Sequence, residues 1–85
     1  MDNDNPWISE IKAEIDRVLK EYFGSKLDKY LLIHSMGNFH DLFVKVTDEN
    51  LDLPMEYRYM LEDFCDEREC VLKIFVGSEI EGRNM

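Results

Sequence analysis

The sequence predicts one small α+β domain with the element order α-β-β-α-β. Its 85 residues are enough for a single hydrophobic core, and a hydrophobic content of 45% is typical of a globular chain. Two segments with apolar residues at helical spacing are interspersed with three segments rich in β-branched and aromatic residues. We expect the domain to span residues 1–77, and residues 78–85 to form a polar, disordered tail.

The first element is predicted to be a helix that begins near Asn5 and Pro6, because these residue types are common at helix starts. Gly24 is expected to end it, since glycine readily adopts the left-handed conformation that follows many helices. Between these limits, apolar residues recur at helical spacing and form one stripe: Ile8, Ile11, Ile15, Val18, Leu19 and Tyr22.

The next two elements are predicted to be strands over residues 29–35 and 39–46, joined by a turn at Gly37 and Asn38. This turn places Met36 opposite Phe39, His34 opposite Asp41, and Ile33 opposite Leu42. One side of the hairpin then carries Leu31, Ile33, Leu42, Val44 and Val46. The other side carries Tyr30, Leu32, His34, Met36, Phe39, Asp41, Phe43 and Lys45.

A second helix is predicted near Pro54, followed by a third strand over residues 70–76. The buried stripe of this helix is expected to consist of Tyr57, Met60, Leu61 and Phe64. A right-handed crossover makes the third strand parallel to the second. Because the first strand is among the most apolar, we place it in the middle. The prediction is therefore a three-stranded antiparallel sheet of order 2-1-3, with both helices packed on one face.

The charge distribution favours a basic protein partner. Nineteen acidic and ten basic residues give a net charge of −9, and residues 47–85 alone carry eleven acids and four bases. A negative field of this size repels phosphate groups, so it disfavours nucleic acid and anionic membranes as partners. The sequence also contains no apolar run long enough to cross a membrane.

An acidic patch is predicted at the end of the second helix. The C-terminus of a helix carries partial negative charge and favours cations, yet acids crowd this one. The functional interpretation is a contact surface for lysine and arginine side chains, and the alternative is a solvated, slightly frayed helix end. The candidate partner-binding residues are Glu62, Asp63, Asp66, Glu67 and Glu69.

A second candidate surface is the sheet face opposite the helices. A monomer rarely exposes a large apolar patch, so we expect this face to bind a partner protein or a second copy of the chain. The alternatives are a platform on which nucleic-acid bases stack, or a second core covered by one of the helices. The candidate residues are Tyr30, Leu32, His34, Phe39, Phe43 and Phe75.

The cysteines and histidines do not predict a catalytic or metal site. Cys65 and Cys70 are too few for a disulfide framework, so we expect reduced thiols and a cytoplasmic location. His34 and His40 are expected on opposite faces of the hairpin, where they could not bind one metal ion together. The sequence lacks phosphate-loop and hydrolase motifs, so we expect no enzyme activity, no metal and no cofactor.

The sequence therefore favours a non-enzymatic, small acidic interaction or regulatory protein of the inhibitor, immunity or adaptor type, binding a basic protein surface. An acidic array that imitates a nucleic-acid backbone is a related possibility. Two alternatives remain: a small nucleic-acid-binding domain that uses an aromatic sheet face, and a structural subunit of a larger assembly.

Overall fold

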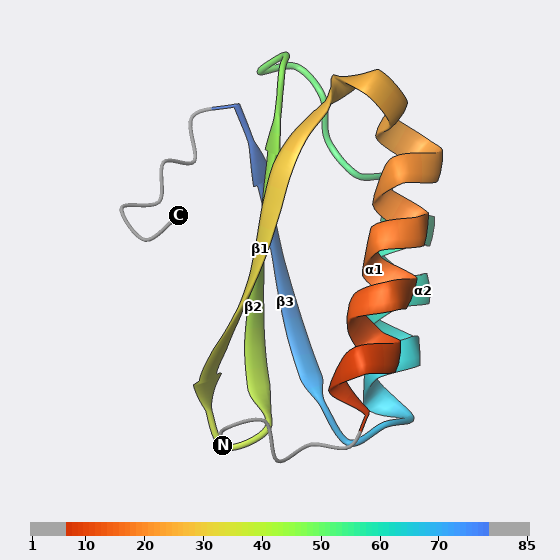
Figure 1. Ribbon diagram of the computed structural model, residues 1–85, viewed down its shortest axis with the longest axis vertical. Coiled ribbons are helices and arrows are strands. Elements are labelled where there is room, and N and C mark those ends of the chain that lie inside the picture. The colour runs from red at the N-terminus through yellow and green to blue at the C-terminus, as the bar shows by residue number, and fades with distance from the viewer. Residues whose placement is uncertain (1–6, 79–85) are drawn as a thin grey trace.

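The chain folds into two helices and a three-stranded sheet. The computed structural model describes residues 7–78. The elements are α1 (Ile8–Phe23), the short 3-10 turn η1 (Gly24–Lys26), β1 (Leu27–Met36), β2 (Phe39–Val46), α2 (Met55–Asp66) and β3 (Val71–Gly77). Figure 1 shows α1 and α2 on the same face of the sheet, as predicted. The α+β class and the element order are confirmed. The expected helix start at Asn5 and Pro6 lies outside the described residues, as does most of the expected tail.

The predicted strand order 2-1-3 is wrong, because β2 is the central strand and the order is β1-β2-β3. β1 pairs with β2 antiparallel and β3 pairs with β2 parallel, so the sheet is mixed and not antiparallel. The connection through α2 places β3 directly beside β2, as in a βαβ unit. The central place of β2 also shows in its burial pattern, since His40, Leu42, Val44 and Val46 are all buried.

The predicted hairpin register is correct only at Met36, which lies opposite Phe39. The register shifts between His34 and Met36, so Ser35 is an extra residue in a β-bulge. A shift of one residue moves every side chain beyond it to the other face. Consequently, His34 lies opposite His40 instead of Asp41, Ile33 lies opposite Asp41, and Leu32 lies opposite Leu42.

The core lies between the two helices and the inner face of the sheet. Most of the predicted α1 stripe is buried, but Tyr22 is 39% exposed. In α2, Leu61 and Cys65 are buried, whereas Met60, which was expected to be buried, is 42% exposed. The buried apolar residues are Ile11, Ile15, Val18, Leu19, Phe23, Leu42, Val44, Val46, Leu53, Leu61, Cys65, Cys70, Leu72 and Ile74.

Candidate partner-binding surfaces

The helix α2 ends in a tight turn that determines where its acids lie. The N–H of Cys70 donates to the carbonyl of Cys65 over 2.9 Å, and the N–H of Glu69 donates to the carbonyl of Asp66 over 3.0 Å. These two bonds form a Schellman motif, in which the residue after the helix adopts a left-handed conformation. Here that residue is Glu69, with φ 60°, although glycine is the usual occupant.

The predicted acidic residues gather at this end of α2 with few cations beside them. Glu62, Asp63 and Asp66 belong to the helix, which has no basic residue in its last turn. Among residues 7–78, the side chains of these three acids and of Glu69 make no hydrogen bond or ion pair. Glu67 approaches Arg68 only at 3.7 Å.

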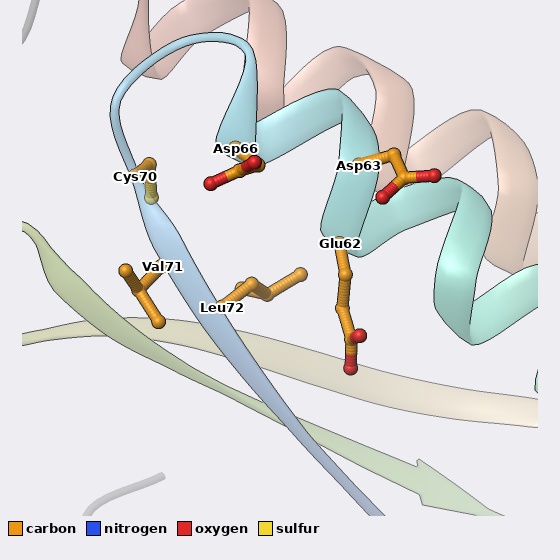
Figure 2. A pocket seen from close by; sticks show the side chains of 6 residues that line it. All are labelled: Glu62, Asp63, Asp66, Cys70, Val71 and Leu72. Atoms are coloured by element: carbon orange, nitrogen blue, oxygen red, sulfur yellow. The ribbon is translucent and has the colours of Figure 1, made fainter.

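Three of these acids line a pocket of about 300 Å³ beside β3. Glu62, Asp63 and Asp66 contribute carboxylates from α2, and Cys70, Val71 and Leu72 contribute the strand side (Figure 2). Figure 2 shows the side chain of Glu62 extending from α2 toward β3, with Asp66 nearer to Cys70. A lysine or arginine side chain matches this chemistry, since it joins an aliphatic stem to a cationic end.

The nearby cation Arg68 is already engaged elsewhere. Its Nε lies 3.1 Å from Oε1 of Glu10 on α1, and its Nη1 donates to the carbonyl of Phe64 over 3.0 Å. The guanidinium also lies 3.6 Å from the centre of the Phe64 ring. Arg68 thus joins the end of α2 to the beginning of α1 and does not neutralise the pocket.

The predicted sheet-face residues divide between the two faces of the sheet. Phe39, Phe43 and Phe75 lie on the open face, where the rings of Phe43 and Phe75 stack with centroids 5.2 Å apart. Tyr30 and Leu32 lie on the helix face and pack against the core. His34 also lies on the helix face, so these last three do not share a surface with the phenylalanines.

Contacts on the helix face accompany this placement. The hydroxyl of Tyr30 donates to Oδ1 of Asp16 on α1 over 2.6 Å. Burial and this carboxylate raise the pKa of Tyr30 to about 12. Leu31 and Ile33, which the sequence pattern assigned to the core, lie on the open face instead. The bulge at Ser35 is responsible, and no residue type there distinguishes a bulge from a regular strand.

The two histidines lie on the same face, contrary to expectation. Their ring centroids are 4.8 Å apart, and Nδ1 of His40 lies 3.1 Å from Sγ of Cys70. Burial, together with the charge of His34, lowers the pKa of His40. Within the described part of the chain, no three His, Cys, Asp or Glu side chains are arranged to hold a metal ion.

The Schellman motif also brings the two cysteines together, since they occupy the two positions whose side chains usually touch in it. Both thiols are buried and unpaired by a disulfide. Burial raises the pKa of Cys65 to about 12 and also raises the pKa of Cys70. Because the thiolate is the reactive form, this arrangement favours packing over nucleophilic chemistry.

Comparisons with protein-family models, curated proteins and solved structures give no match to this chain. No helix among residues 7–78 is both long and apolar enough to cross a membrane.

Proposed function

We propose that this protein is a non-enzymatic interaction protein of the inhibitor, immunity or adaptor type, and that it binds a basic protein surface through the acidic end of α2. The observation that carries this proposal is the pocket in which Glu62, Asp63 and Asp66, which have no ion-pair partner among residues 7–78, lie beside β3. Carboxylates at a helix C-terminus oppose the helix dipole and each cost about 0.3–1 kcal/mol. A cation from a partner relieves this repulsion.

Both long-range and short-range electrostatics support the proposal. Residues 47–69 contain nine acids and two bases, so the field around α2 attracts a positively charged partner and accelerates encounter. At contact, an arginine stem fits against Val71 and Leu72, and its guanidinium reaches the carboxylates. The two unpaired thiols fit a reducing compartment, so we include a cytoplasmic location in the proposal.

The second candidate function is single-stranded nucleic-acid binding on the open sheet face. The stacked pair Phe43 and Phe75, with Lys73 on the same strand as Phe75, favours it. The net charge of −9 opposes it, because affinity for a phosphate backbone depends on lysine and arginine contacts.

A titration with an arginine-rich peptide tests the first proposal. We expect backbone amide shifts in residues 62–72 and an association rate that falls with added salt. The variant Asp63→Asn with Asp66→Asn should associate more slowly and show a weaker salt dependence.

The matched control removes two acids elsewhere, as Glu49→Gln with Glu56→Gln, and should keep most of the association rate. Equal losses in both variants would mean that the peptide responds to total charge, which contradicts a specific site. Salt-dependent binding of a single-stranded oligonucleotide, with shifts at Phe43 and Phe75, would favour the second candidate.

A further inference from the structure

The two edges of the sheet differ in how their backbones are protected. β3 carries Lys73 near its middle, and Nη1 of Arg58 on α2 donates to the carbonyl of Ile74 over 3.2 Å. Arg58 is held in place by the carbonyl of Leu53 at 3.0 Å and by Asp52 at 2.7 Å. Charged side chains and covering contacts are the usual means by which proteins block edge strands from pairing.

In the part of the chain that the structure describes, nothing protects the central part of the β1 edge in this way. Bulges interrupt the pairing near Asp28 and Ser35, but residues 29–34 pair regularly with β2. Residues 30–33 contain no charged side chain and no proline. Among the described residues, no side chain hydrogen-bonds to the main chain of residues 30–33. Within residues 7–78, this edge therefore presents unpaired backbone groups that a further strand can use.

The side chains at the centre of β1, residues 30–33, are apolar on both faces. Leu31 and Ile33 lie on the open face, Tyr30 and Leu32 lie on the helix face, and all four are only half-buried. An exposed edge strand that is apolar and uncharged is a template for pairing with a strand of another chain. The central part of β1 has this character and occupies an edge.

We propose that β1 pairs with β1 of a second copy of this chain, antiparallel about a two-fold axis near Leu32, to form a continuous six-stranded sheet. A two-fold interface uses the same surface of both copies, and this segment is complementary to itself because it is uncharged and apolar throughout. Pairing also brings Leu31 of each copy beside Ile33 of the other and joins the two open faces.

The charge distribution favours a second copy over a strongly charged partner. The hairpin, residues 27–46, contains two acids and two bases, whereas the acid-rich segment 47–69 includes α2, which packs against β3 at the opposite edge. Two copies that meet along β1 therefore keep their acidic ends apart. A basic partner is attracted to the acidic end instead, so this inference goes beyond the proposed function and does not rest on it.

Sedimentation velocity over a wide dilution series tests the dimer, with two matched lysine variants. Ile33→Lys places a charge in the unprotected edge, and the new ammonium lies opposite Asp41, which favours a folded chain. We expect this variant to weaken dimerisation at least about tenfold. Phe75→Lys places the same charge on the same face but on β3, and should leave the dimer intact.

Hydrogen exchange of the unmodified chain provides a readout that depends on no variant. As the concentration rises, exchange should slow at amides within residues 30–34 and stay unchanged within residues 71–77. A chain that remains monomeric at every concentration would overturn the proposal. Loss of the dimer in Phe75→Lys but not in Ile33→Lys would also overturn it, since that result indicates packing of the two open faces.

Discussion

The turns after α1 and α2 each contain a residue with positive φ, but the two helix ends have opposite chemistry. Gly24 directly follows α1 at φ 58°, and Glu69 lies in the turn after α2 at φ 60°. The last turn of α1 contains Lys20, whose ammonium lies 3.2 Å from Asp16, whereas the last turn of α2 contains no base. One end follows the rules for a stable helix terminus, and the other breaks them in residue type and in charge.

This difference indicates that the end of α1 serves folding, whereas the end of α2 meets a different requirement. α1 contributes five buried residues to the core, and its end is built from residues that favour folding. The end of α2 keeps carboxylates where they oppose the helix dipole. Residues that break a local rule without a local gain are expected at functional sites. The comparison can be tested by exchanging these features one at a time.

The largest effect is expected from Arg68→Ala, because Arg68 is the contact that holds the end of α2 to α1. Its side chain is 23% exposed, stacks on Phe64 and bonds to Glu10. The change should lower the free energy of unfolding by about 2 kcal/mol, measured by urea denaturation. The control Arg17→Ala removes an exposed pair with Glu14 and should cost about 0.5 kcal/mol. Similar losses in both variants would show that Arg68 contributes no more to stability than an exposed ion pair does.

The end of α1 should not tolerate a side chain at Gly24. No atom would contact an added Cβ within 4 Å, so the whole cost of Gly24→Ala comes from the backbone, whose φ of 58° and ψ of −127° are rarely adopted by residues other than glycine. That cost is about 1–2 kcal/mol, which should lower the melting temperature. An unchanged melting temperature would mean that the turn relaxes to another conformation.

At the end of α2 the reverse exchange, from a larger residue to glycine, should stabilise the protein. Glu69→Gly removes both the backbone strain and a carboxylate near the helix end, so we expect a gain of about 1 kcal/mol in unfolding free energy. Glu69→Gln separates the two contributions, since it removes the charge and keeps the strain. If glycine destabilises the protein, the turn gains something from Glu69 that its geometry does not reveal.

A smaller gain is expected from the pocket acids themselves. Asp63→Asn with Asp66→Asn should raise the unfolding free energy by about 0.5 kcal/mol, because both side chains oppose the helix dipole and form like-charge pairs on the helix. The gain should shrink as salt is added. A clear loss of stability at low salt would show that these two carboxylates support the fold.

The free energy of unfolding should also depend on pH through His40, which lies beside Cys70 near the end of α2. The pKa of His40 lies below its ordinary 6.5, so near and below that value the unfolded chain binds more protons. Stability is then complete above about pH 6.5 and falls as the pH drops through the lower folded pKa. The charges acting on His40 are those of His34 and Asp41.

Unfolding free energies measured at about pH 7 and about pH 5 test this dependence. The variant His40→Gln, which cannot gain the proton, should lose less stability between the two values than the unmodified chain. An identical loss in both proteins would assign the acid sensitivity to other groups.

The sequence was sufficient to predict the helices and strands, but not the order of the strands in the sheet. The spacing of Ile11, Ile15 and Leu19 is a local signal, and it predicted α1 correctly. Strand order depends on the path of the connection between two strands, which no local pattern records. The apolar character of β1 suggested a central position in the sheet. That character instead reflects Leu31 and Ile33 on the open face, which no local pattern distinguishes from core residues.

The acidic end of α2 was visible in the sequence because the helix dipole makes its acids unusual. The pocket was not, since it requires Val71 and Leu72 to lie beside Asp66. The sheet-face residues were misplaced by one feature, the bulge at Ser35, which moved Tyr30, Leu32 and His34 together to the other face. One extra residue in a strand therefore reverses the assignment of a whole surface.

The parallel pairing of β2 and β3 has a consequence for how the chain folds during synthesis. Met36 meets Phe39 within the hairpin, but Phe39 also pairs with Val71, 32 positions further along the chain. Local pairs form quickly and distant ones slowly, so we expect one side of β2 to stay open until β3 has been made. The segment emerging during that interval is the most acidic part of the protein. We expect the repulsion between these segments of different chains to oppose association of unfinished chains at the open strand, so that the same charges act before folding is complete.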